Sequence, residues 1–151
     1  MNKLPMNLHI INGPNLNLLG TRETDIYGTE SFETYFQMLV EKYNFVKLHY
    51  YQSNVEGELI NQLQSIGFSS DGIILNAGGY THTSVALTDT VKAISTGVVE
   101  VHISNIYARE EYRKNSLLSS NCIGIISGLG LQAYDFAIQF FIGRNRMKDR
   151  A

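Results

Sequence analysis

The sequence lacks the features of disulfide-bonded, exported and membrane proteins. Its single cysteine, Cys122, excludes an intramolecular disulfide and suits a reducing compartment such as the cytosol. No run of apolar residues approaches the ~20 needed to cross a bilayer. The first residues show no basic segment followed by an apolar one, so no export signal is expected. We therefore expect a cytoplasmic protein without membrane contacts.

Charged residues are also scarce. Twelve basic and fourteen acidic residues give a net charge of −2, which argues against binding to nucleic acid or to an anionic membrane. An ordinary chain of this length would carry about 38 charged residues. The charges in residues 67–108 are Asp71, Asp89, Lys92 and Glu100, and in residues 115–143 there is Asp135. Because interface cores are depleted of charge, we predict a homo-oligomer in which the second half of the chain is the assembly surface.

What the sequence does contain is an alternation of strand-like and helix-like segments. Residues 32–43 repeat apolar side chains on one helical face, whereas residues 45–51 alternate as a strand does. The expected strands are residues 6–11, 45–51, 72–76, 97–104 and 122–127. Four helices are expected. The first covers residues 32–43, and the second is capped by Asn54 and ends at Gly67. The third runs for about a dozen residues from Ser84, and the last contains Leu131 and Phe141 and precedes a basic tail.

Five units, each a strand followed by a helix, predict an α/β fold with a doubly wound parallel sheet. For five strands the flavodoxin-like order 2-1-3-4-5 is the natural choice, and the length fits one domain over residues 1–151. Ligands bind such sheets beyond the carboxyl ends of the strands. There the sequence places loops rich in Asn, Ser and His: NGPNLN, QSN, NAGGYTHTS and HISN. We therefore predict that these four loops form one site.

The loops exclude several kinds of site. GLGLQA (128–133) loosely fits a dinucleotide-binding pattern, but it follows the last strand and has no acidic partner, so its glycines are interpreted as turn and packing residues. None of the four strand-end loops contains a lysine, which disfavours a phosphate clamp and a Schiff base. The histidines lack the spacing of metal ligands, and His9 and His49 are expected to be packed or surface residues of strands.

The kind of chemistry that these loops still allow is acid–base catalysis. Glu100 and His102 lie two positions apart at the end of a strand and therefore share one face. Glu100 can then orient His102 and hold its protonated form. The alternative is a buried ion pair with a structural role only.

A long loop, LGTRETDIYG, carries Arg22 and Tyr27 and has the length of an active-site lid. Tyrosine is a poor base at its usual pKa of about 10, and an adjacent guanidinium would lower that pKa. Arg109 and Arg113 lie in loops that could reach the same edge, where a small carboxylate could bind. The alternative is a surface loop with ordinary solvated charges.

Together, several segments of the sequence resemble those of type II 3-dehydroquinate dehydratases, and the resemblance covers nearly the whole chain. The segments that carry the resemblance are INGPNLNLLGTRETDIYG, QSNVEGELI, ILNAGGYTHTSVALTD, VEVHISNIYAREEYRKNS and SGLGLQAY. The resemblance implies a lyase that dehydrates 3-dehydroquinate to 3-dehydroshikimate in the shikimate pathway, which leads to chorismate and the aromatic amino acids, with no metal or organic cofactor. It also implies trimers that assemble into a homododecamer.

The resemblance further implies roles for individual residues. Tyr27 corresponds to the base that removes the proton next to the ketone to give an enolate, and Arg22 to the residue that activates it. Asn15 corresponds to the residue that holds a water at the enolate oxygen, and His102, oriented by Glu100, to the general acid. The residues that correspond to substrate-binding groups are Asn76, His82, Arg113, Ile103 and Ser104, together with Asp89, which would reach a neighbouring subunit's site.

One position departs from the family pattern. The lid usually reads Arg-Glu-Pro, and here Thr24 replaces the proline, which gives the loop more conformational freedom. Two alternatives to the dehydratase stay open at this point. One is a flavodoxin-like module that binds an anion or nucleotide without catalysis, and the other is a lyase or isomerase that applies enolate chemistry to another small acid.

Overall fold

The structure, a computed structural model, describes residues 3–21 and 23–151, and for Tyr27 the backbone alone. At its centre is a sheet made of β1 (Met6–Asn12), β2 (Val46–Gln52), β3 (Gly72–Asn76), β4 (Val98–His102) and β5 (Gly124–Ser127). The strand order is β2-β1-β3-β4-β5, and every neighbouring pair is parallel. The predicted flavodoxin-like order is therefore confirmed.

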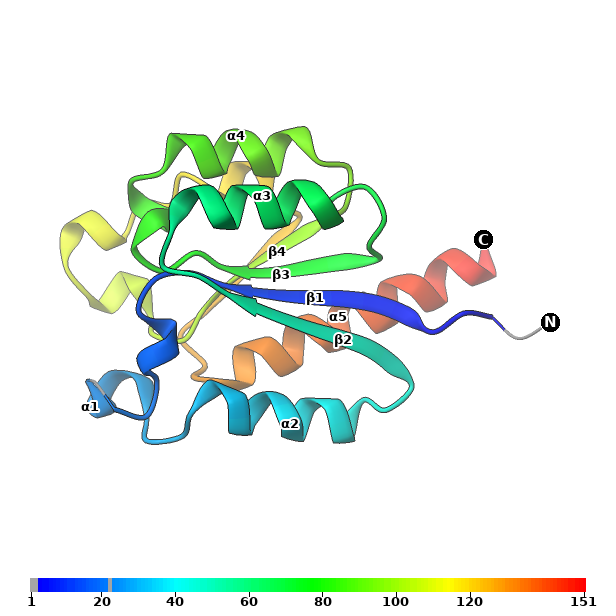
Figure 1. Cartoon of the computed structure of the whole chain (residues 1–151), viewed down its shortest axis with the longest axis horizontal. Coiled ribbons are helices and arrows are strands. Elements are labelled where there is room, and N and C mark those ends of the chain that lie inside the picture. Colours follow the sequence, from blue (N-terminus) through cyan, green and yellow to red (C-terminus); the bar gives the residue numbers. More distant parts are fainter. Residues whose placement is uncertain (1–2, 22) are drawn as a thin grey trace.

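Helices cover both faces of the sheet (Figure 1). On one face lie α2 (Phe32–Lys42) and α5 (Gln132–Arg150), and on the other lie α3 (Glu56–Ile66) and α4 (Val85–Ala93). This is the doubly wound arrangement that the alternation of segments predicts. The expectation of a helix after every strand is wrong for β4, which is followed by the short turns η3 (Ile106–Ala108), η4 (Glu111–Arg113) and η5 (Ser119–Asn121). No helix in the described part of the chain is long and apolar enough to cross a membrane.

Each helical layer has its own hydrophobic core. Leu8 and Ile10 of β1 cluster with residues of α2 and α5, whereas Ile11 clusters with residues of α3 and α4. β3 and β4 are buried at every position, because helices cover both of their faces. A large apolar side chain contributes ~1.5–3 kcal/mol when it is fully buried. The two cores therefore hold the strands, and with them the carboxyl edge of the sheet, in a fixed arrangement.

The predicted start of α4 at Ser84 is confirmed, but its length is not. Ser84 Oγ accepts a hydrogen bond from Leu87 N at 2.9 Å, which caps the helix. α4 has nine residues rather than about a dozen, because Ile94 takes an extended conformation (φ −78°, ψ 154°) after Ala93.

The prediction that Asn54 caps the second helix is wrong. Val55 is the N-cap residue of α3 and has no side-chain cap. Ser53 holds this turn instead, because its hydroxyl accepts a hydrogen bond from Val55 N at 2.9 Å. The Asn54 side chain accepts one from Asn15 N at 2.9 Å. Asn54 therefore ties the loop after β2 to the loop after β1.

Two further boundaries differ from the expectation. The expected basic tail, Arg144 to Arg150, belongs to α5, where its cations lie near the negative end of the helix dipole. β5 begins at Gly124, so Cys122 precedes the strand. Burial raises the pKa of the Cys122 thiol to about 12, which keeps the thiol protonated and unreactive at neutral pH.

Candidate active site

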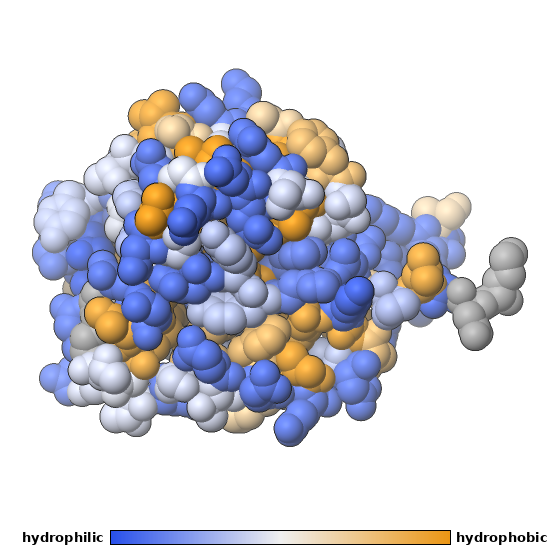
Figure 2. Space-filling model, in the orientation of Figure 1, coloured by the Kyte–Doolittle hydropathy of each residue, from blue (hydrophilic) through white to orange (hydrophobic). Residues whose placement is uncertain are grey.

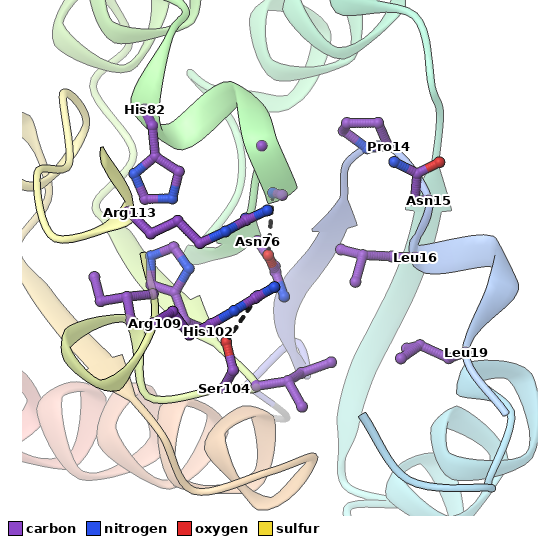
Figure 3. Close-up of a pocket in the computed structure, with 14 residues that line it drawn as sticks. Pro14, Asn15, Leu16, Leu19, Asn76, His82, His102, Ser104, Arg109 and Arg113 are labelled. Carbon is purple, nitrogen blue, oxygen red and sulfur yellow. Dashed lines mark hydrogen bonds between the residues drawn. The ribbon is translucent and has the colours of Figure 1, made fainter. Parts of the chain in front are cut away.

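A pocket of about 130 Å³ lies beyond the carboxyl ends of β1, β3 and β4, beside the point where the strand order reverses (Figure 3). Three of the four predicted loops line it, and the fourth contributes Asn54, which holds the backbone of Asn15. The predicted site residues that line the pocket are Asn15, Asn76, His82, His102, Ile103, Ser104 and Arg113. The structure thus brings together side chains that are up to 98 positions apart in the sequence.

His102 ends β4 and lines the pocket, with Glu100 buried behind it. His102 Nε2 lies 2.6 Å from Glu100 Oε1, and Glu100 has no exposed surface. The hydroxyls of Ser116 and Ser119 donate to the same carboxylate at 2.7 and 2.6 Å. Burial alone would raise the pKa of Glu100, but these three hydrogen bonds outweigh burial and lower the pKa. Glu100 is therefore ionised at neutral pH.

This pair has the arrangement of a general acid and its orienting carboxylate. The Glu100 carboxylate holds Nε2 of the His102 ring and fixes the rotation of that ring. Because Glu100 occupies Nε2, Nδ1 is the ring nitrogen left for a substrate. The structure brings the two residues together as their spacing predicts, and their roles in catalysis stay predictions.

His82 stands beside His102 in the pocket lining (Figure 3). The ring centroids are 6.3 Å apart and the ring planes differ by 24°. Burial lowers the pKa of His82 more than its hydrogen bond to Asn115 O raises it, and His102 lowers it further. Asn115 O lies 2.8 Å from Nδ1, so the neutral ring donates from Nδ1 and offers Nε2 as an acceptor.

Two arginines bring positive charge to the pocket from the loop after β4. Arg109 Nη1 donates to Ser104 Oγ at 3.3 Å, a bond drawn in Figure 3, and Arg113 Nε donates to Glu110 Oε2 at 2.9 Å. Burial alone would lower the pKa of Arg113, but the Glu110 carboxylate raises it. Guanidinium groups bind carboxylates with two parallel hydrogen bonds, so this side of the pocket suits a small anion.

Arg109 lines the pocket but was not among the predicted site residues. Its loop was expected to reach this edge, so its position after β4 was the signal that could have identified it. Leu16 and Leu19 were also missed. They are buried, and they form an apolar wall opposite the histidines (Figure 3). Their spacing of three residues matches the short helical turn η1 (Leu16–Leu18), which Leu19 caps.

Asn15 joins the pocket through an unusual backbone conformation. Its φ of 68° lies in the left-handed region, which Asn adopts more readily than most residues with a side chain. The Asn54 side chain holds the Asn15 N–H. Asn15 is therefore fixed at its backbone while its side chain stays exposed at the pocket.

Besides Glu100, which is buried behind His102, three predicted site residues are not placed in the pocket. Asp89 is exposed on α4 and does not line the pocket of its own chain. Tyr27 ends the short helix α1 (Thr24–Tyr27), and its side chain is outside the described part of the structure. Arg22 lies outside the described residues altogether. The roles of all three stay predictions.

Fold and pocket together define the class of protein: an α/β enzyme whose site is arranged for acid–base chemistry on a small anion. The supporting features are the ionised carboxylate behind His102, the neutral His82 and the two arginines. Within residues 3–21 and 23–151, no group of three or more His, Cys, Asp and Glu side chains is arranged to hold a metal ion.

Comparison with known proteins identifies the family. The model of the family described as "Dehydroquinase class II" matches residues 6–142, so the chain belongs to the class II dehydroquinases. A protein of Fusobacterium nucleatum named 3-dehydroquinate dehydratase is 50% identical over 142 residues, which cover 91% of this chain and 97% of that protein.

Solved structures agree with this membership. The crystal structure of the type II dehydroquinase from Butyrivibrio crossotus is 43% identical, with a TM-score of 0.87, and the match covers 91% of this chain and 97% of that one. The type II dehydroquinase from Propionibacterium acnes is 30% identical, with a TM-score of 0.86 and coverage of 92% and 97%.

Proposed function

We propose that this protein dehydrates 3-dehydroquinate to 3-dehydroshikimate, as a lyase of the shikimate pathway that serves chorismate and aromatic amino acid biosynthesis. The observation that carries the proposal is the Glu100–His102 pair at the pocket, in a chain of the class II dehydroquinase family. A module that only binds an anion has no need for a buried, ionised carboxylate behind a histidine. The non-catalytic alternative is therefore not favoured.

The reaction is an anti-elimination through an enolate. Tyr27 removes the proton next to the ketone, and Arg22 favours the phenolate form of Tyr27. The electron pair moves onto the ketone oxygen, where a water held by Asn15 stabilises the enolate charge. The enolate then collapses, the bond to the departing hydroxyl breaks, and His102 protonates this hydroxyl so that water leaves. A positioned acid or base typically contributes ~10²–10⁴-fold to the rate.

The substrate is held on the side of the pocket formed by the loops after β3 and β4. Arg113 and the backbone of Ile103 and Ser104 bind its carboxylate, which the positive charge at this side supports. His82, with Nε2 free to accept, and Asn76 bind its hydroxyls. No metal or organic cofactor takes part.

The protein acts as a homo-oligomer, a dodecamer built from trimers, in the cytoplasm, and each subunit is one domain over residues 1–151. Apolar side chains exposed in the second half of the chain support such an interface: Val85 on α4 is 64% exposed, Ile125 on β5 is 42% and Phe140 on α5 is 44%. β5 is also an edge strand. Over the face of the molecule that Figure 2 shows, apolar and polar side chains are interspersed. Asp89 reaches the site of a neighbouring subunit.

The test of the activity is to incubate the purified protein with 3-dehydroquinate and follow the absorbance of the conjugated enone product. We expect conversion. Binding without conversion would support the anion-binding module, and conversion of other small acids alone would support the second enzymatic alternative. Borohydride added with substrate should leave the enzyme active, because no lysine is among the described residues that line the pocket. Inactivation would indicate imine chemistry.

The test of the assembly is light scattering at the working concentration. A particle several times larger than the 17.0 kDa chain is expected, and a monomer would contradict the proposal.

A further inference from the structure

A chain of buried hydrogen bonds runs from the hydrophobic core to the pocket through Tyr134. Tyr134 lies in the first turn of α5 and has no exposed surface. Its hydroxyl lies 2.7 Å from Asn12 Oδ1 and 2.9 Å from Asn76 Nδ2. Asn12 and Asn76 end the neighbouring strands β1 and β3, where they are paired in register. Asn76 lines the pocket, whereas Tyr134 does not.

The direction of this chain follows from one backbone group. Gly78 N donates to Asn76 Oδ1 at 3.1 Å, a bond visible in Figure 3. A backbone N–H can only donate, so the oxygen of the Asn76 amide faces Gly78 and its NH₂ group faces Tyr134. The Tyr134 oxygen must therefore accept from Asn76. Because a hydroxyl has one hydrogen, that hydrogen goes to Asn12 Oδ1.

This arrangement determines what Asn76 offers to a ligand. One hydrogen of its NH₂ group is used by Tyr134, and the hydrogen bonds described for Asn76 leave the second one unused. We propose that Tyr134 is a positioning residue that locks the Asn76 amide, so that Asn76 presents an N–H donor to an acceptor oxygen of the substrate. The inference rests on the substrate-binding role proposed above for Asn76.

The burial of Tyr134 suits it to this task. Burial raises the pKa of its hydroxyl, so the group stays protonated and keeps both its donor and its acceptor function over the pH range of an assay. The Tyr134 ring packs against Phe32, with ring centroids 4.9 Å apart at an angle of 63°. Replacing tyrosine by phenylalanine keeps this packing and removes only the hydroxyl that holds the amide.

The test is a double-mutant cycle with Tyr134→Phe and Asn76→Ala, read as KM and kcat for 3-dehydroquinate. For Tyr134→Phe we expect KM to rise about fivefold to tenfold, the factor that one hydrogen bond of ordinary strength contributes. The kcat should stay within about twofold, because a contact made equally in ground and transition states affects KM. In the Asn76→Ala background, Tyr134→Phe should raise KM no further.

The matched control is Tyr43→Phe. Tyr43 is also buried, and its hydroxyl donates to Asp135, one position from Tyr134 but outside the pocket lining. We expect this variant to lower thermal stability and to leave KM unchanged. A merely structural role for Tyr134 predicts the same outcome for both tyrosines.

Each other result is also decisive. If Asn76→Ala raises KM and Tyr134→Phe does not, the inference is wrong while the role of Asn76 stands. Additive effects in the double variant would also overturn it. If Asn76→Ala leaves KM unchanged, the proposed role of Asn76 fails and the inference fails with it. If Tyr134→Phe does not fold, Asn12→Ala is the alternative variant, because it removes the acceptor of the Tyr134 hydroxyl hydrogen and keeps the tyrosine ring in place. An unchanged KM in Asn12→Ala would overturn the inference.

Discussion

The two walls of the pocket are built differently. On the side of β3 and β4, His102 is held by Glu100, His82 by Asn115 O, and Asn76 by Gly78 and Tyr134. On the side of β1, the backbone hydrogen bonds described within residues 16–21 and 23–28 join residues three or four positions apart. In that stretch Leu18 and Ile26 are 43% and 40% exposed, whereas Leu16 and Leu19 are buried.

The difference indicates when each part of the site becomes ready. Side chains held by buried partners are in place before a substrate arrives, which reduces the entropy lost on binding. A segment with mainly local hydrogen bonds and exposed apolar side chains opens at lower cost. The groups proposed to bind and to protonate therefore lie on the rigid wall. The proposed base, Tyr27, belongs to the segment after β1, which we expect to close over the substrate.

The largest effect is expected for Tyr27→Phe on the β1 side. Removing the base should lower kcat by ~10²–10⁴-fold, while a ring carboxylate analogue still binds to the preformed wall, as calorimetry would show. Tyr107→Phe is the control, because Tyr107 is 62% exposed and does not line the pocket, and it should keep full activity. Near-normal turnover of Tyr27→Phe would refute the mechanism.

A smaller effect on kcat is expected for Glu100→Gln on the rigid wall, the side of the pocket formed by β3 and β4. The substitution keeps the size of the side chain but removes the negative charge that lies 2.6 Å from His102 Nε2, so kcat should fall about tenfold to a hundredfold. Asp135→Asn is the matched control, because Asp135 is also a buried carboxylate with several partners. It accepts a hydrogen bond from Lys42 at 2.6 Å and does not line the pocket. Equal kcat values in the two variants would show that Glu100 serves the fold alone.

The rigid wall should also respond to acid. The pKa of Glu100 is lower in the folded protein than its usual value of 4.5, so its stabilising effect is complete above that value and is lost as the pH falls through the lower, folded value. We expect the unfolding free energy to decline below about pH 4.5, by up to ~1.4 kcal/mol per pH unit for one such group. Urea unfolding of Glu100→Gln between pH 3 and 7 should show a flatter decline, and an identical slope would contradict this assignment.

The smallest effect is expected for Thr24→Pro. Thr24 is the first residue of α1, a position that accepts proline, and the fixed φ would reduce the freedom of the open loop. Amide hydrogen exchange in residues 23–28 should slow, with kcat/KM within about twofold of the original. Proline also disfavours the left-handed conformation of the preceding Glu23, whose φ is 39°. Unchanged exchange would show that Thr24 does not loosen the loop.

Much of this architecture could be predicted from the sequence, because it depends on periodicity. Alternating segments determine a parallel sheet, and the carboxyl ends of its strands must then meet at one edge. The pairing of Glu100 with His102 follows from the same geometry, since residues two apart share one face of a strand. His82 and Arg113 could be assigned to that edge for the same reason.

Other features depend on contacts between distant residues and left no local signal. Asn54 fits a helix cap, yet its side chain binds the backbone of Asn15, 39 positions away. Tyr134 fits the core face of a helix, and its sequence position does not reveal that its hydroxyl meets Asn76, 58 positions away. Ser116 and Ser119 likewise resemble ordinary loop serines until the fold brings them to Glu100.

The contrast between the two walls is tested most directly by amide hydrogen exchange with and without a bound ring carboxylate analogue of the substrate. The account predicts that residues 16–21 and 23–28 gain protection on binding, while residues 98–102 of β4 and 76–82 after β3 change little. Protection gained mainly in the β3 and β4 segments, with the loop after β1 unchanged, would contradict it.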